Sequence, residues 1–279
     1  MPISLTGSVG QNGKNSPGDV RFVFSLFNKI LPTPLAVDDQ CSADLIQAIY
    51  DFQRHFLSQP DGRIDVGGTT WRKLNAAVDG HGSSGKPLLL LSFDDGPVPV
   101  AALHSILTTL DAAGVKAEFY VLGKEVDSFP AAAKEIVQLG HRVQNHSYSH
   151  VNLANATEAV VRSELEKTQD SIKRATGISP TKIRPPYGAG GWPPYDPQLA
   201  RVAASLSLHI ENWEIDTEDW KSPKGMMDSD KLRTIKKQLD QRGGSGPLNV
   251  LMHIQSETAR DLSSFISQLK AWGYLFAAP

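Results

Sequence analysis

The residues of this chain best suited to chemistry are two adjacent carboxylates, Asp94 and Asp95, and two histidines, His146 and His150. The carboxylates directly follow the apolar run 88–91, which predicts a buried strand. Successive side chains of a strand point to opposite faces, so one carboxylate can bind a metal while its neighbour accepts a proton. One carboxylate and two imidazoles are enough for an open metal site that keeps a position for water.

Three further polar clusters follow predicted strands. They are Arg184-Pro185-Pro186-Tyr187-Gly188, Asp216-Thr217-Glu218-Asp219-Trp220 and Leu251-Met252-His253. Each cluster alone has an ordinary structural explanation, such as a solvated turn, a helix cap or a core histidine. The carboxyl ends of parallel strands meet at one edge of a sheet or barrel, where catalytic groups collect. Five clusters in this common position therefore predict an active site.

The elements that position these clusters follow from apolar periodicity. In the first part of the chain we expect helices over 19–31, 42–57 and 70–77. After residue 85 strand and helix patterns alternate, which predicts an α/β fold with a parallel sheet, open or closed into a barrel. The expected strands are 88–93, 117–122, 141–146, 182–187, 209–215 and 248–253, and the expected helices are 100–113, 130–139, 157–175, 196–207, 229–241 and 258–271.

Composition divides the chain and narrows its partners. A lead segment (1–18), a three-helix domain (19–78), a Gly/Ser-rich linker (79–85) and an α/β domain (86–279) are expected. The net charge of −2 gives no reason to expect nucleic acid as partner, and no apolar stretch is long enough for a membrane span. Cys41 is the only cysteine, which excludes an internal disulfide and predicts a small buried side chain.

The five polar clusters resemble, in order, the five motifs of the polysaccharide deacetylase family, carbohydrate esterase family 4, also called the NodB homology domain. The resemblance covers about residues 86–276, with Ser92 where the first motif more commonly has Thr. It implies a distorted (β/α) barrel and metal-dependent removal of acetyl groups from sugars, typically N-acetylglucosamine. By resemblance, the metal ligands are Asp95, His146 and His150. Zinc is the first choice of metal, with cobalt or nickel as substitutes.

The resemblance also implies the catalytic groups. Asp94 is expected to be the general base, held by Arg184, and His253 the general acid, tuned by Asp219. The remaining positions are expected to surround the acetyl group. The backbone amide of Tyr187 would face the developing oxyanion, and Trp220 and Leu251 would line the acetyl pocket. The chemistry agrees, because amide hydrolysis needs an activated water, a proton acceptor and an acid for the departing amine.

The first part of the chain resembles a three-helix peptidoglycan-binding domain over about residues 16–78. The resemblance is carried by Asp19-Val20-Arg21 with Leu26-Phe27-Asn28, by Ala48-Ile49-Tyr50-Asp51-Phe52-Gln53, and by Pro60 to Asp65 with Gly67 to Trp71. It favours peptidoglycan as the substrate, with N-acetylglucosamine or N-acetylmuramic acid as the reacting sugar. A scaffold module that does not bind glycan remains an alternative.

Other activities and a delivery route stay open at this point. Chitooligosaccharides and acetyl-xylan are alternative substrates, and a non-catalytic wall-binding protein is a different class of function. An iron oxygenase also uses two histidines and one carboxylate, and dependence on oxygen and a reductant would identify it. Residues 1–18 lack the regions of a secretory signal peptide and resemble the start of wall-binding modules of contact-dependent secretion effectors. We expect action in the bacterial periplasm or cell wall, either by such a route or after trimming of a signal.

Overall fold

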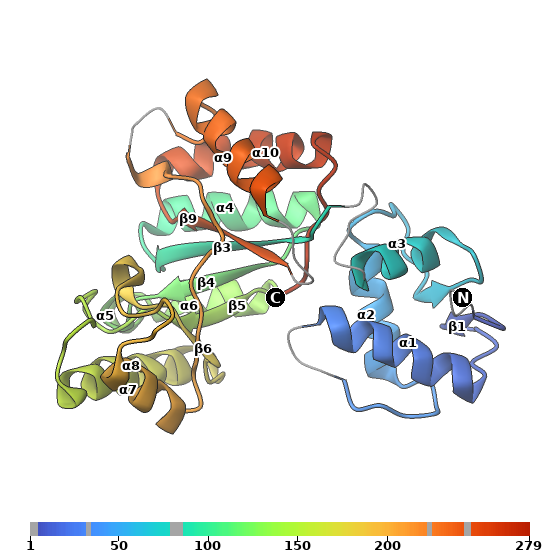
Figure 1. Cartoon of the computed structure of the whole chain (residues 1–279), viewed down its shortest axis with the longest axis horizontal. Coiled ribbons are helices and arrows are strands. Elements are labelled where there is room, and N and C mark those ends of the chain that lie inside the picture. Colours follow the sequence, from blue (N-terminus) through green and yellow to red (C-terminus); the bar gives the residue numbers. More distant parts are fainter. Residues whose placement is uncertain (1–4, 32–34, 79–85, 222–224, 243–246) are drawn as a thin grey trace. The chain divides into compact units, whose positions relative to one another are not determined.

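The computed structural model describes residues 5–31, 35–78, 86–221, 225–242 and 247–279 (Figure 1). The chain divides into two compact units. Unit 1 comprises Met1–Leu90, Gly243–Leu248 and Ser267–Pro279, and unit 2 comprises Leu91–Arg242 and Asn249–Ile266. The predicted linker 79–85 and the first four residues of the predicted lead segment lie outside the described residues, so this domain boundary stays a prediction.

Unit 1 is built around three helices, as the periodicity predicts. They are α1 (Pro17–Ile30), α2 (Ala43–Gln53) and α3 (Thr69–Val78). A short antiparallel pair, β1 (Val9–Gly10) and β2 (Arg63–Ile64), joins them. The apolar face of α1 is buried in the core of the unit, and Cys41 packs against that core half-buried. Helix α2 ends four residues before the predicted end, because hydrogen-bonded turns replace the helix up to Leu57.

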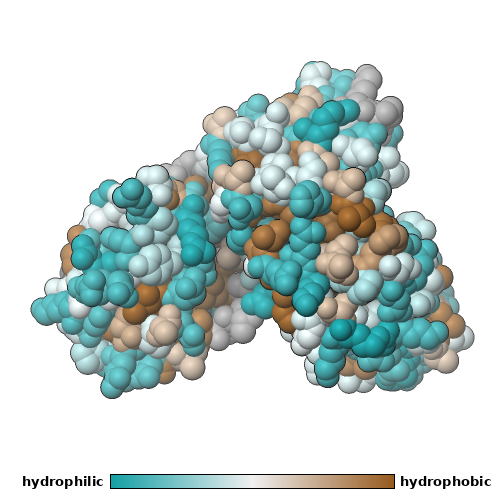
Figure 2. Space-filling model, turned by 180° about the vertical axis from the view of Figure 1, so that it is seen from behind, coloured by the Kyte–Doolittle hydropathy of each residue, from teal (hydrophilic) through white to brown (hydrophobic). Residues whose placement is uncertain are grey.

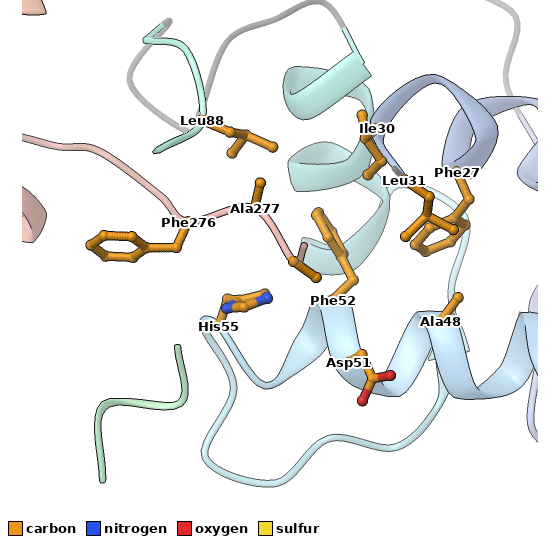
Figure 3. Close-up of a pocket in the computed structure, with 11 residues that line it drawn as sticks. Phe27, Ile30, Leu31, Ala48, Asp51, Phe52, His55, Leu88, Phe276 and Ala277 are labelled. Carbon is orange, nitrogen blue, oxygen red and sulfur yellow. The ribbon is translucent and has the colours of Figure 1, made fainter. Parts of the chain in front are cut away.

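Figure 3 shows a mostly apolar pocket within unit 1. Its lining comes from α1, from α2 and from the C-terminal segment 276–278. That segment is held by a bridge between Leu89 and Phe276 and by the Ala277 amide, which donates to the Leu89 carbonyl at 2.8 Å. The last residues of the chain therefore pack within unit 1.

Unit 2 holds most of the α/β part of the chain, although the first residues of β3 and β9 and the end of α10 belong to unit 1. The sheet has the order β7-β6-β5-β4-β3-β9-β8, and the recorded strand pairs β3/β4, β4/β5, β5/β6, β6/β7 and β8/β9 are parallel. Its strands are β3 (Leu89–Gly96), β4 (Ala117–Val121), β5 (Arg142–Asn145), β6 (Lys182–Ile183), β7 (His209–Ile210), β8 (Ile215–Asp216) and β9 (Leu248–His253). Its helices are α4 (Val100–Ala113), α5 (Gly123–Ser128), α6 (Pro130–Gln138), α7 (Glu158–Thr176), α8 (Pro197–Ser205), α9 (Ser229–Gln241) and α10 (Ser256–Ala271).

The sheet curls into a distorted (β/α) half-barrel, which confirms the expected fold. Strands β7 and β8 lie at opposite edges, yet only four residues separate Ile210 from Ile215. Five Cα–Cα steps reach at most about 18 Å, whereas a flat sheet of seven strands is about 29 Å wide. The two edges must therefore approach each other. The prediction of one strand over 209–215 is wrong in this respect: the Glu211 amide bonds to β6 and the Glu214 amide to β9.

Two other elements differ from the expectation. The predicted strand 182–187 is limited to β6, since Pro185 and Pro186 have no amide hydrogen for a ladder, and a 3-10 turn follows over Pro186–Gly188. Helix α5 was not predicted, because six residues are too few for a periodic pattern.

The surface of the chain is mixed in character. Figure 2 shows hydrophilic residues over most of the visible face of each unit, with hydrophobic residues gathered over one area of unit 2. Among the described residues, no helix combines the length and the apolar character needed to cross a bilayer.

Candidate active site

The predicted metal ligands lie together at the carboxyl edge of the sheet. Asp95 ends strand β3, and His146 and His150 follow β5. The Oδ1 atom of Asp95 lies 3.1 Å from Nε2 of His150 and 3.4 Å from Nε2 of His146. All three candidate ligand atoms lie within 4.8 Å of one another. The structure thus brings together three residues that are up to 55 positions apart in the sequence.

The protonation of this group suits a divalent metal. The Nδ1 atom of His146 lies 2.7 Å from the Arg184 carbonyl, which can only accept, so Nδ1 carries a hydrogen and Nε2 is the ring nitrogen on the side of Asp95. The Oδ1 atom of Asp95 is buried without a hydrogen-bond partner of its own. Burial raises the pKa of Asp95, but the contacts with His146 and His150 outweigh it and hold the pKa well below its usual range. Two imidazoles and one carboxylate in this arrangement fit a divalent cation.

A carboxylate that the sequence analysis missed holds the histidine loop. Glu164 of α7 accepts the amides of Tyr148 and Ser149 at 2.9 and 2.8 Å, and the Ser149 hydroxyl at 2.9 Å. The loop needs such support, because Ser147 and His150 have φ values of 66° and 63°. Nothing in the spacing of Glu164 distinguishes it from a solvated helix residue, so only the packing of α7 identifies it.

The N-terminus of α5 holds the same loop from another side. The amides of Gly123 and Lys124 donate to the carbonyls of Ser147 and Tyr148, both at 3.1 Å. A Cβ atom on Gly123 would lie 2.5 Å from the Tyr148 ring, so only glycine permits this approach. The histidine pair is therefore fixed by backbone contacts as well as by Glu164.

The predicted base, Asp94, is buried against the predicted arginine. The Nη1 atom of the fully buried Arg184 donates to Asp94 Oδ1 at 2.7 Å and to Ser92 Oγ at 2.9 Å. Its Nη2 atom donates to Asn249 Oδ1 at 3.0 Å, and its guanidinium stacks on the Tyr120 ring at 3.9 Å. Asp94 Oδ2 lies 3.7 Å from His146 Nε2. Arg184 thus occupies one oxygen of Asp94 and leaves the other on the side of His146, one of the three candidate metal ligands.

Ser92 and Asn249 were not predicted as site residues. Ser92 donates to Asn249 Oδ1 at 2.6 Å, so the two side chains form one support for the guanidinium. The only available signal was their position two residues before Asp94 and two before Leu251 on the same strands.

The predicted acid, His253, is paired with Asp219. Its Nδ1 atom lies 2.8 Å from Asp219 Oδ1, and its amide donates to Asp219 Oδ2 at 2.7 Å. The hydroxyl of Thr258, a residue the sequence analysis missed, donates to the same Oδ2 at 2.6 Å. Burial lowers the pKa of His253, but Asp219, together with the charges of Asp94 and Asp95, raises it to about 9. His253 is therefore a cation at neutral pH and can donate a proton.

The three remaining predicted residues lie beside these groups. Tyr187 has φ 63°, and its exposed ring contacts the His150 ring at a centroid distance of 4.8 Å. Trp220 is exposed in the turn after β8. Leu251 is buried on β9, two residues before His253 and therefore on the same face of the strand. The predicted residues of all five motifs thus lie at or beside the carboxyl edge of one sheet.

Comparison with known proteins identifies relatives of this chain. The family described as polysaccharide deacetylase matches residues 81–210. Peptidoglycan-N-acetylglucosamine deacetylase PgdA of Listeria monocytogenes is 35% identical over 189 residues, which is 67% of this chain and 37% of that protein. The chain thus spans well under half the length of this relative. Peptidoglycan-N-acetylmuramic acid deacetylase PdaC of Bacillus subtilis is 30% identical over 188 residues, again 67% of this chain and 37% of that protein.

Solved structures give the same result. The Bc1960 peptidoglycan N-acetylglucosamine deacetylase superposes with a TM-score of 0.56 at 32% identity, over 68% of this chain and 85% of that one. A carbohydrate esterase family 4 pseudoenzyme from Bacillus anthracis superposes with a TM-score of 0.57 at 28% identity, over 68% and 62% of the two chains. By sequence, fold and the order of its five motifs, this chain belongs to the polysaccharide deacetylase family, carbohydrate esterase family 4.

Proposed function

We propose that this chain is a metal-dependent de-N-acetylase of peptidoglycan, acting on the acetamido group of N-acetylglucosamine or N-acetylmuramic acid. One observation carries the proposal: a carboxylate held by a buried arginine and a histidine cation held by a buried aspartate accompany the His-His-Asp group. An acceptor and a donor of protons at one potential metal site are the requirements of amide hydrolysis. The relatives' names supply the substrate class.

The metal-binding residues are proposed to be Asp95, His146 and His150. Zinc is favoured because it prefers nitrogen ligands and keeps an open position, with cobalt or nickel as substitutes. When bound, such an ion polarises the acetyl carbonyl and lowers the pKa of a bound water towards neutrality.

Asp94 is proposed to accept the proton of the attacking water. Its Oδ1 is engaged by Arg184, so Oδ2, on the side of His146, is the oxygen available for this proton. The new bond joins the water oxygen to the acetyl carbon, and the negative charge collects on the former carbonyl oxygen. The Tyr187 amide is proposed to donate a hydrogen bond to that oxygen.

His253 is proposed to protonate the amine as the carbon–nitrogen bond breaks, which releases acetate and leaves an amino sugar. A neutral amine leaves far more readily than an amide anion, so a cationic donor is needed at this step. Asp219 orients His253 and stabilises its charge. Trp220 and Leu251 are proposed to enclose the acetyl methyl group.

Residues 16–78 are proposed to bind the same polymer. Tethering a glycan-binding module to the enzyme raises the effective concentration of substrate at the catalytic site. Such a substrate implies work in the periplasm or cell wall, and export as a secretion effector is part of this proposal. Within this region the structure contains the three expected helices.

A non-catalytic wall-binding protein is the second candidate, because one of the matched structures is named a pseudoenzyme. The presence of base, acid and all three candidate metal ligands in one site favours the enzyme.

The test is release of acetate from purified peptidoglycan by the protein before and after removal of metal with a chelator. We expect release that the chelator abolishes and that zinc or cobalt restores, and release by the Asp94→Asn variant that is slower by about two to four orders of magnitude. Release only from chitin oligomers or acetyl-xylan would replace the substrate, and no release from any of these polymers would favour the binding protein.

A further inference from the structure

We propose that Trp192 forms a binding surface for the sugar unit that neighbours the one being deacetylated. This inference rests on the proposed function, because it assigns a second contact to the same polymeric substrate. It gives a role to a loop, residues 189–196, that the five motifs do not include.

Exposed aromatic side chains are concentrated near the candidate active site. Within the described ranges, five large aromatic residues are exposed: Phe129, Tyr187, Trp192, Tyr195 and Trp220. Tyr187, Trp192 and Tyr195 lie in the segment 187–195 that follows β6, and Trp220 follows β8. Exposed aromatic groups beside a candidate site are typical of a binding surface.

Trp192 packs against the backbone of the third motif. A Cβ atom on Gly188 would lie 2.9 Å from Nε1 of Trp192 and 3.0 Å from the ring of Trp213. The absence of a side chain at Gly188 therefore lets both indoles approach the residue that follows Tyr187. Tyr187, the residue before Gly188, contacts the ring of the candidate metal ligand His150, so Trp192 covers a backbone position next to a residue of the candidate site.

The position of Trp192 is fixed before any substrate binds. The buried Asn212 donates from Nδ2 to the Gly191 carbonyl at 2.7 Å, immediately before Trp192. After it, the Asp196 amide donates to the Gly190 carbonyl at 2.8 Å. The indole also meets Trp213 edge to face at a centroid distance of 5.6 Å. Trp192 is nevertheless 48% exposed, so the loop presents a large aromatic surface at little further cost in conformational entropy.

The chemistry of this surface suits a sugar ring. A pyranose in a β-linked N-acetylated polymer carries C–H groups on its flat faces and hydroxyl groups around its edge. The electron-rich face of an indole attracts C–H groups while the hydroxyl groups remain in water. A polymer chain continues beyond the reacting sugar, so the neighbouring unit is the one that reaches Trp192.

The test compares Trp192→Ala, the conservative Trp192→Phe and a matched control, Phe129→Ala, which removes an exposed aromatic side chain from the junction of α5 and α6. Deacetylation kinetics are measured on chitin pentaose and on a small acetyl ester that cannot reach a second subsite. We expect Trp192→Ala to raise KM for the oligosaccharide by about tenfold with little change in kcat, and to leave the ester unaffected. Trp192→Phe should retain most of the affinity, and Phe129→Ala should behave as the unmodified protein.

Equal kinetics of Trp192→Ala and the unmodified protein on the oligosaccharide would overturn the inference, and so would an equal loss on the ester. Binding of chitin pentaose to the Asp94→Asn protein, with and without Trp192→Ala, is measured by calorimetry in parallel. This binding measurement reports on the contact with Trp192 even if the protein shows no turnover. A loss of binding with Trp192→Ala supports the inference, whereas unmodified protein that releases no acetate from any glycan contradicts the proposed function instead.

Discussion

Units 1 and 2 both bury polar side chains, but the two sets do different things. In unit 1, Gln53 donates to Asp61, Arg63 and Thr70 and accepts the amides of Asp61 and Gly62, which closes the turn before β2. Asp19 similarly accepts the amide and hydroxyl of Thr6. These groups satisfy the backbone and hold a turn.

In unit 2 several of the buried polar groups are charged, and Asp94, Arg184 and Asp219 lie at or beside one edge of the sheet. Asp94 with Arg184 and Asp219 with His253 are fixed pairs, while Asp95 Oδ1 is left without a hydrogen bond. Because both units bury polar groups, burial of such groups alone does not identify a functional site. A site is indicated by paired charges that leave one buried oxygen for something the chain does not supply.

The largest expected effect follows from the metal ligands. His146→Ala and His150→Ala each remove one of three ligand atoms, and we expect each variant to lose bound metal and activity. Elemental analysis of the purified proteins checks the metal and acetate release checks the activity. Stoichiometric metal in the variant that combines both substitutions would show that the metal site lies elsewhere. The buried charges of unit 2 would then have no proposed role in binding metal.

Removal of the base should leave the metal in place. Asp94→Asn keeps the size of the side chain but not its capacity to accept a proton, so we expect kcat to fall by about two to four orders of magnitude. Elemental analysis should give the same metal content as in the unmodified protein. Activity close to that of the unmodified protein would contradict the role of Asp94.

Glu164 shares features with the buried polar groups of both units. It accepts backbone amides, as Gln53 does, but the loop that it holds carries His146 and His150, two of the proposed metal ligands. Glu164→Gln keeps the shape of the side chain and weakens its three hydrogen bonds, so we expect metal affinity to fall by about ten- to a hundredfold. Competition with a chelator measures the affinity. Glu166→Gln, a substitution of a more exposed carboxylate on the same helix, is the matched control and should change nothing.

The pH dependence should report His253. The proposed acid must be protonated, and its pKa is raised to about 9, so kcat/KM should fall as the pH rises through this value. Asp219→Asn removes the charge that raises the pKa while the burial that lowers it remains. The alkaline fall of kcat/KM should therefore move to lower pH by about one unit or more. An unchanged pH dependence of kcat/KM in this variant would show that His253 is not the group that donates the proton.

The smallest effect on chemistry is expected in unit 1. Gln53→Leu leaves buried amides and the Thr70 hydroxyl without their partner, so the free energy of unfolding of this unit should fall by about 2–4 kcal/mol. Denaturant unfolding measures the loss. Turnover of a small acetyl ester should stay the same. A large loss of that turnover would show that the buried polar groups of unit 1 also serve the chemistry.

The sequence predicts the parts of this molecule that depend on local pattern. The amphipathic spacing predicts helices α1 and α7. The rule that parallel strands end at one edge predicts that Asp94, His146 and His253 lie together, as they do in the structure. Long-range packing lies beyond such patterns. The division of 209–215 between two sheet edges depends on barrel closure, and Glu164 has the spacing of a solvated helix residue. The Gly- and Pro-rich loop around Trp192 has no periodicity that could place its indole.

The most direct test of the central claim is mass spectrometry of muramidase-digested peptidoglycan after incubation with the unmodified protein and with Asp94→Asn. The account predicts muropeptides that have lost an acetyl group from the amino sugar, formed by the unmodified protein with zinc, absent after chelation and formed far more slowly by Asp94→Asn. Fully acetylated muropeptides from metal-loaded unmodified protein, or equal deacetylation by both proteins, would contradict it.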